Sequence, residues 1–327
     1  MTEDVVSVSA PARLHLGFLD PGGRSGRRFG GIGLALAEPA TRLSIRRASA
    51  DRADGPEAGR ALAHLDAIRA HLGLGDRRYA LSFAETIPPH AGLGSGTQLA
   101  LAVATALRAI EGLAPDPAGD AARLGRGNRS GLGAAFVEAG GVAVDGGKGP
   151  TDAPPPIIAR LPFPAAWRVL LVLDPRTEGF HGEAELAAFA GLPPFPESDT
   201  ARICRLVLLE ALPALAEADI AGFGAAIGTI QQMVGSHFAP AQGGIFTSPA
   251  VAEICALLAE HGAHGPGQSS WGPTGFAFAP SPEEADRLLL AVGDRAAEAG
   301  LTLRVVAGRN AGARVERSPL RRIAGTG

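Results

Sequence analysis

The stretch Ile87-Pro-Pro-His-Ala-Gly-Leu-Gly-Ser-Gly-Thr97 decides how this chain is expected to fold. It follows an alternating apolar segment at 79–83, typical of a strand, and precedes an apolar run at 98–110, typical of a helix. Glycines let the backbone approach an anion without a Cβ in the way, and the amides at the start of the next helix point at the same place. The stretch therefore predicts a phosphate-binding turn. Its predicted binding residues are Gly92, Gly94, Ser95, Gly96 and Thr97.

Around this turn, the first half of the chain mixes strand and helix patterns. Residues 5–18 alternate and end at the turn Pro21-Gly22-Gly23, residues 32–36 and 41–47 predict two more strands, and residues 61–72 have helical spacing. We therefore predict a mixed α/β domain that carries the phosphate turn.

The second half predicts helices packed on an antiparallel sheet. The expected strands are 167–173, 275–279 and 301–306, and the expected helices are 201–217, 220–235, 248–260 and 282–299. Glycine and proline are concentrated at 146–156, which marks a boundary between the two halves. We predict an N-terminal phosphate-binding domain at 1–160 and a C-terminal α+β domain at 161–327.

The composition limits the classes of partner. With 327 residues and 46% hydrophobic content the chain can bury a sizeable core, and a formal net charge of −3 argues against a nucleic-acid binder. No apolar run reaches the roughly 20 residues that span a bilayer, and the first residues are acidic, so we expect no membrane association and a cytoplasmic location. Cys204 and Cys255 lie in apolar helical patterns and are expected to be buried thiols.

The order P-x-x-x-G-L-G-S at 88–95 resembles the phosphate-binding motif of the GHMP kinase superfamily, which includes galactokinase, homoserine kinase and mevalonate kinase. Residues 10–17 resemble the first motif of that superfamily, and 265–276 lie where its third motif is expected. The resemblance implies an α+β, two-domain GHMP-kinase-like fold. Three departures argue against phosphorylation by ATP: Arg13 replaces the usual lysine, Gly96 replaces a serine, and Ser269-Ser-Trp-Gly-Pro273 replaces a glycine string.

Six blocks in order resemble the β-ribofuranosylaminobenzene 5′-phosphate synthases. They are 10–20, 26–36, 88–97, 125–133, 242–246 and 267–275. The resemblance implies a phosphoribosyltransferase of tetrahydromethanopterin biosynthesis that joins phosphoribosyl pyrophosphate to 4-aminobenzoate and releases CO2 and pyrophosphate. It also implies Mg2+ as a cofactor and a homodimer. The residues leave open whether 4-aminobenzoate or 4-hydroxybenzoate is the acceptor.

Such a reaction needs cations around the departing pyrophosphate. Arg126, Arg129 and Ser130 on the second glycine stretch are predicted to bind phosphate, and a solvated arginine pair is the alternative for the first two. Arg27 and Arg28, in a glycine-flanked loop, are predicted to clamp the acceptor carboxylate or the 5′-phosphate. The alternative for this pair is an exposed turn.

Arg13 and His15 alternate with leucines on one strand, so their side chains share a face, and Asp20 follows at the turn. These three are the predicted catalytic residues. A buried core histidine is the alternative for His15, and a turn cap is the alternative for Asp20. Asp20 and Asp145 are the predicted carboxylates near the magnesium ion.

Four further residues are predicted to contact substrate. Gln242, Ser269 and Ser270 are expected to donate hydrogen bonds, and Trp271 to stack on the acceptor ring, with a core position as its alternative. His181 and Glu185 stand at helical spacing, for which the start of a helix is favoured over a metal pair. Two other functions stay open at this point: an ATP-dependent GHMP-type kinase of a small alcohol, and a non-catalytic ligand sensor.

Overall fold

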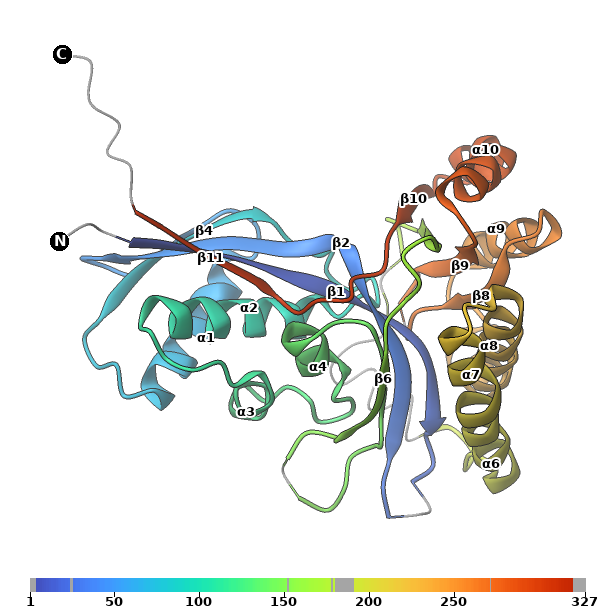
Figure 1. Ribbon diagram of the computed structural model, residues 1–327, viewed down its shortest axis with the longest axis horizontal. Coiled ribbons are helices and arrows are strands. Elements are labelled where there is room, and N and C mark those ends of the chain that lie inside the picture. The colour runs from blue at the N-terminus through green and yellow to red at the C-terminus, as the bar shows by residue number, and fades with distance from the viewer. Residues whose placement is uncertain are drawn as a thin grey trace.

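A computed structural model of the chain describes residues 4–23, 26–151, 153–177, 179, 191–270 and 272–319. It contains two sheets with separate sets of helices (Figure 1). The first sheet has seven strands, in the order β11-β1-β2-β4-β3, and β5 pairs with β2 and with β6. Its strands are β1 (Asp4–Asp20), β2 (Phe29–Ala48), β3 (Arg52–Asp54), β4 (Arg78–Glu85), β5 (Val142–Asp145), β6 (Ile157–Leu161) and β11 (Arg314–Pro319).

Helices cover one face of the first sheet (Figure 1). They are α1 (Ala58–His71), α2 (Ser95–Ile110), α3 (Pro117–Arg123) and α4 (Leu132–Glu138). The central helix is α2, whose alanine, leucine and valine side chains are buried on nearly every side between the sheet and α1. A helix that is apolar all round needs such a central position, because no face of it suits water. Burial of α2 thus fixes the phosphate turn at its N-terminus.

The second sheet has four antiparallel strands in the order β10-β7-β9-β8. They are β7 (Arg168–Leu173), β8 (His264–Gln268), β9 (Gly275–Ala279) and β10 (Thr302–Val306). The helices of this part are α6 (Glu197–Leu206), α7 (Leu212–Ala216), α8 (Ile220–Gln242), α9 (Pro249–Glu260) and α10 (Pro282–Glu298), with a π-helical turn η1 (Val207–Ala211) between α6 and α7. Serine side chains cap α9 and α10: Ser248 accepts from the Val251 amide, and Ser281 from the Glu284 amide.

The long hairpin of β1 and β2 joins the two parts. Beyond the register shift at Pro11 and Ala12, its apolar side chains pack against the C-terminal helices. Leu14, Leu16 and Ile32 of the hairpin share one core with Phe223 and Ile227 of α8. The phosphate turn therefore lies where the two sheets meet.

Three details differ from the sequence expectations. One long strand, β2, replaces the two predicted at 32–36 and 41–47. The last strand, β11, pairs with β1, so a segment beyond residue 160 belongs to the first sheet. Cys204 is exposed on α6, so its expected burial is wrong, whereas Cys255 is buried and burial raises the pKa of its thiol to about 12. In the described part of the chain no helix combines the length and apolar character needed to cross a bilayer.

Candidate active site at the phosphate turn

The turn before α2 requires glycine at two positions, because of its backbone angles and its close contacts. Gly92 and Gly94 both have positive φ angles, 80° and 77°, and Gly94 is the N-cap residue directly before α2. A Cβ on Gly92 would collide with the Ser269 carbonyl oxygen. A Cβ on Gly94 would lie 3.2 Å from the Cβ of Arg13. The glycines are therefore required by close contacts within the protein on two sides.

Ser269 ties three predicted site segments together. Its hydroxyl accepts a hydrogen bond from the His15 amide (3.0 Å) and donates one to the Gly92 carbonyl (2.9 Å). The Arg13 amide in turn donates to the Leu93 carbonyl (3.0 Å). Because Ser269 is fully buried and its hydroxyl both donates and accepts, it positions the turn against β1. Its contact with substrate stays a prediction.

His15 is enclosed beneath the turn. It is buried, its ring lies 4.5 Å from that of Phe18, and burial followed by the charge of Arg13 lowers the pKa of its imidazole to about 3. At neutral pH the ring is uncharged and cannot act as a proton donor from an imidazolium. This is the environment of the core histidine that the sequence left as an alternative.

Asp145 anchors the second glycine stretch to the first sheet. Its carboxylate is buried and accepts three hydrogen bonds, from the Ser130 hydroxyl (2.8 Å), the Gly131 amide (3.1 Å) and the Gly147 amide (3.0 Å). Burial raises the pKa of Asp145, while these donors and the charge of Arg13 act in the opposite direction. The stretch that carries Arg126 and Arg129 is thus held beside the phosphate turn.

A cationic cluster faces the first turn of α2. A Cβ on Gly96 would lie 2.9 Å from Nη2 of Arg60 and 3.5 Å from Nη1 of Arg126, so both guanidinium groups lie against this glycine. Arg60 is also paired with Glu57 (2.6 Å). Burial and the charge of Arg60 lower the pKa of Arg126. Burial, then Arg126 and Arg60, lower the pKa of His64 to about 4.

This cluster holds donors that the protein does not use. Within the described ranges, Nε of Arg126 and Nε2 of His64 are buried without a hydrogen-bond partner. Like charges that are close together and partly dehydrated are stabilised by an anion between them. The sequence pattern does not single out Arg60 and His64. Their four-residue spacing places them on one face of α1, but nothing in the sequence shows that this face contacts the turn.

The tip of the β1–β2 hairpin uses its charged residues differently. Arg27 donates from Nε and Nη2 to the carbonyls of Gly146 (2.7 Å) and Gly147 (2.8 Å), and Arg28 donates to the Pro21 carbonyl (3.3 Å). Asp20 accepts from the amides of Gly22 and Gly23, both at 2.9 Å, and from the Thr200 hydroxyl (3.3 Å). The bonds of Asp20 are those of the turn cap that was its alternative. Its catalytic role, and substrate binding by the two arginines, stay predictions.

Gln242 and Ser270 belong to one hydrogen-bonded group around Gln268. Nε2 of Gln242 donates to the Ile245 carbonyl (2.8 Å), and its Oε1 accepts from Gln268 (3.4 Å), which also donates to the Ser270 carbonyl (3.1 Å). With His15 these residues line a cavity of only about 20 Å³. Trp271, His181 and Glu185 lie outside the described residues.

The two carboxylates expected to bind magnesium are both engaged by protein donors, as given above. Across the described ranges, no three His, Cys, Asp or Glu side chains gather in a way that suits a metal ion. Magnesium is usually held by one or two carboxylates together with water and substrate phosphates, so binding of the ion by Asp20 or Asp145 stays a prediction.

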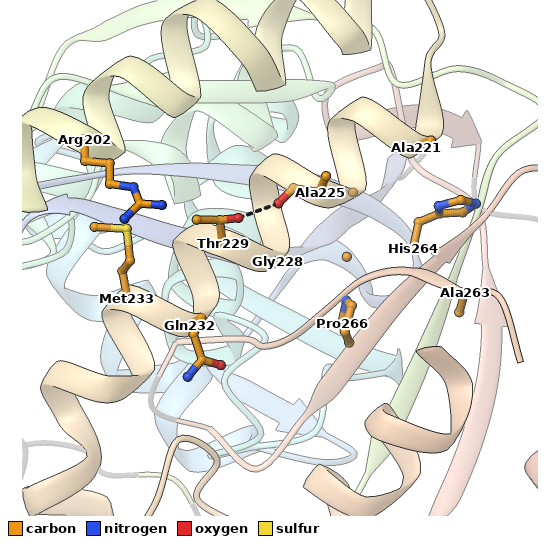
Figure 2. Close-up of a pocket in the computed structure, with 12 residues that line it drawn as sticks. Arg202, Ala221, Ala225, Gly228, Thr229, Gln232, Met233, Ala263, His264 and Pro266 are labelled. Carbon is orange, nitrogen blue, oxygen red and sulfur yellow. Dashed lines mark hydrogen bonds between the residues drawn. The ribbon is translucent and has the colours of Figure 1, made fainter. Parts of the chain in front are cut away.

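A larger depression elsewhere lacks such convergence. A groove of about 590 Å³ lies along α8 and is lined by small residues such as Gly224 and Gly228. Figure 2 shows Arg202 and His264 at its opposite ends. The Thr229 hydroxyl in it donates to the Ala225 carbonyl of its own helix (2.9 Å). The phosphate turn, where several cations meet, is the better candidate for an active site.

Comparison with known proteins agrees with this geometry. Residues 59–141 match the family described as the GHMP kinases N terminal domain, and residues 211–298 match the GHMP kinases C terminal family. Among solved structures, homoserine kinase from Cytophaga hutchinsonii superposes with a TM-score of 0.69 at 18% identity and covers 95% of this chain and 97% of its own. Mevalonate diphosphate decarboxylase from Staphylococcus aureus gives 0.70 at 14% identity, covering 96% and 98%. The chain therefore has the GHMP-kinase fold.

Curated relatives narrow the family. Beta-ribofuranosylphenol 5'-phosphate synthase from Archaeoglobus fulgidus is 36% identical over 241 residues, which cover 70% of this chain and 76% of the relative. The protein of the same name from Methanothermobacter thermautotrophicus is 33% identical over 289 residues, covering 81% and 86%. The chain belongs to the beta-ribofuranosylphenol 5'-phosphate synthase family.

Proposed function

We propose that this chain is a decarboxylating phosphoribosyltransferase of tetrahydromethanopterin biosynthesis. It joins phosphoribosyl pyrophosphate to 4-aminobenzoate, forms a C-glycoside and releases CO2 and pyrophosphate. Family membership supports the reaction, and one structural observation carries it to particular residues: the guanidinium groups of Arg60 and Arg126 meet at Gly96, in the first turn of α2.

The proposed reaction balances without an external acid or base. The C1–oxygen bond of the ribosyl donor breaks, and its electron pair leaves with pyrophosphate. The ring carbon that bears the carboxylate bonds to C1. The bond from that carbon to the carboxylate then breaks, its electron pair restores the aromatic ring, and CO2 departs in place of a proton. A site whose enclosed histidine, His15, is uncharged is compatible with this chemistry, because no ring proton has to be removed.

The difficult part is the departure of pyrophosphate. Negative charge grows on the leaving group as the C1–oxygen bond stretches, so fixed cations and amides stabilise the transition state more than the ground state. Arg60 and Arg126 supply such cations beside the first turn of α2, and the buried Nε of Arg126 and Nε2 of His64 have no partner among the described residues. We assign the pyrophosphate end of the donor to this cluster.

We propose that the acceptor ring carries an amino group, as in 4-aminobenzoate. The curated relatives are named for a phenol product, so 4-hydroxybenzoate is the acceptor to compare with 4-aminobenzoate. We also propose Mg2+ dependence, a homodimer and a cytoplasmic location, which rest on the family resemblance. Activity after chelation and readdition of Mg2+ tests the ion, and sedimentation of the purified chain tests the dimer.

The test follows carboxyl-labelled 4-aminobenzoate incubated with phosphoribosyl pyrophosphate and Mg2+. We expect labelled CO2 and pyrophosphate in equal amounts, and neither product when one substrate is left out. The same assay with labelled 4-hydroxybenzoate ranks the two acceptors. ADP formation from ATP in the presence of a small alcohol, with no CO2 release from either benzoate, would instead favour a GHMP-type kinase.

A further inference from the structure

A second cavity, of about 370 Å³, lies next to the phosphate turn where the two sheets meet. Pro88, Pro89 and Ala91 form one wall and immediately precede Gly92 in the chain. Pro273 and Pro39 contribute further apolar surface. Proline rings are rigid and present flat C–H faces, so little conformational entropy is lost when a planar ring binds between them. The size and walls of this cavity suit one aromatic ring.

The polar groups of the cavity are few, and two have no use within the protein. Thr274 is fully buried, and its Oγ1 has no hydrogen-bond partner in the described part of the chain. A buried hydroxyl without a partner is uncommon because its desolvation is not repaid. Arg304 on β10 is exposed, and its side chain makes no ion pair or hydrogen bond with any described residue.

The charge balance of the cavity favours an anion. Its one carboxylate, Asp174, is already bonded to Arg176 (3.0 Å), to the Thr177 hydroxyl (3.2 Å) and to the Ser248 hydroxyl (2.8 Å). These donors hold the pKa of Asp174 down at about 2, so it stays ionised and paired. The charge of Asp174 is thus balanced by Arg176, and Arg304 remains as an unbalanced cation.

We propose that this cavity, between Pro88–Ala91 and Arg304, binds the aromatic carboxylic acid that accepts the ribosyl group. The inference rests on the proposed function, which requires a para-substituted benzoate close to the donor. The ring lies between the proline faces, the carboxylate pairs with Arg304 at the exposed side, and the para amino or hydroxyl group bonds to Thr274 Oγ1. The wall that holds the ring is continuous in sequence with the turn that holds the donor.

The arginines at the hairpin tip are less suited to the acceptor carboxylate than Arg304 is. Arg27 and Arg28, the arginines that the sequence indicated for the acceptor carboxylate, donate to backbone carbonyls. Arg304 has no such engagement among the described residues. An arginine without a protein partner beside a rigid apolar slot is the better match to a benzoate.

The test measures binding of 4-aminobenzoate to the full chain by calorimetry, without and with phosphoribosyl pyrophosphate, and the KM for 4-aminobenzoate in the CO2 assay. We expect Arg304→Ala to weaken binding and raise KM about tenfold, the loss of one charge-assisted pair, and Arg304→Lys to recover part of it. Thr274→Val, which keeps the side-chain volume nearly unchanged, should bind 4-aminobenzoate no better than unsubstituted benzoate. Arg295→Ala, an exposed arginine on α10 paired with Glu253, is the matched control and should change nothing.

The outcomes separate this inference from the proposed function. If the wild type releases CO2 but Arg304→Ala leaves both the dissociation constant and KM unchanged, the pocket assignment is overturned and the function stands. If Arg304→Ala abolishes benzoate binding while the wild type shows no turnover, the pocket stands and the function fails. Because Thr274 is buried, a thermal melt of Thr274→Val accompanies its titration, and the exposed Arg304 keeps the test decisive when that variant does not fold.

Discussion

The phosphate turn and the groove along α8 differ in the residues that they present. The groove has a volume of about 590 Å³, and glycine and alanine form much of its wall, together with a threonine whose hydroxyl bonds within its own helix. At the turn, the guanidinium groups of Arg60 on α1 and Arg126 in the loop after α3 meet at Gly96, and the imidazole of His64 lies near both. Convergence of unused donors distinguishes a site for chemistry better than volume does.

Removal of the cations at the turn is expected to have the largest effect. Arg126→Ala should lower kcat/KM for phosphoribosyl pyrophosphate by roughly 10²- to 10³-fold, as loss of one preorganised charge donor typically does, and Arg60→Ala with Arg126→Ala by roughly 10⁴-fold. Steady-state kinetics of pyrophosphate release measure the effect. Arg52→Ala, an exposed arginine on β3, is the control and should keep wild-type kinetics. Equal kinetics for Arg126→Ala and the control would remove the cluster from the mechanism.

The next largest effect concerns stability in acid. The pKa of His15 is lowered from 6.5 to about 3 in the folded protein, chiefly by burial, so the unfolded chain binds the proton more tightly. The folded state is therefore favoured above pH 6.5, and this contribution is lost as the pH falls from 6.5 towards 3, by roughly 5 kcal/mol in all. Urea unfolding at several pH values measures the slope, and His15→Gln should flatten it. An unchanged slope in that variant would place the acid sensitivity elsewhere.

Asp145 tests whether the second glycine stretch is held by a structural carboxylate or by a metal. Asp145→Asn replaces an acceptor of three hydrogen bonds by a group with one acceptor oxygen and an NH2 that faces donors, so we expect a loss of about 2 kcal/mol of unfolding free energy. Urea unfolding measures it. The Mg2+ concentration for half-maximal activity should stay within twofold of the wild type. A large shift in that concentration with unchanged stability would make Asp145 a metal ligand.

The sequence predicted the parts of this structure that depend on local pattern. The turn at 87–97, the apolar helix after it and the helices and strands of the second half follow from glycine positions and periodicity, and all appear in the fold. The family likewise followed from six short blocks. Resemblance to known motifs identified Arg13 and Ser269, and the structure brings both to the turn. Asp145 was expected near a magnesium ion, and in the fold its carboxylate bonds to the second glycine stretch.

Features that depend on distant contacts did not follow from pattern. The pairing of β11 with β1 joins residues about 310 positions apart, and the short polar strand 314–319 gives no periodic signal for it. Arg60 and His64 become significant only because α1 packs beside α2. Conversely, the glycines around Arg27 indicate a ligand-binding loop. In the fold, however, the carbonyls of Gly146 and Gly147, which are distant in the chain, accept its hydrogen bonds.

The smallest predicted effect concerns the stability of α8 at two glycines of the groove. A Cβ on Gly228 would lie no closer than 3.8 Å to Gly265, so Gly228→Ala fits and should stabilise the helix by about 0.5–1 kcal/mol, since glycine loses more backbone freedom on folding. Its neighbour on the same face is the matched contrast: a Cβ on Gly224 would lie 2.6 Å from the His264 Cβ, so Gly224→Ala should destabilise. Thermal melts measure both. Because no chemistry is assigned to the groove, Gly228→Ala should turn over at the wild-type rate, and a clear loss of kcat in this more stable variant would show that the groove serves the reaction after all.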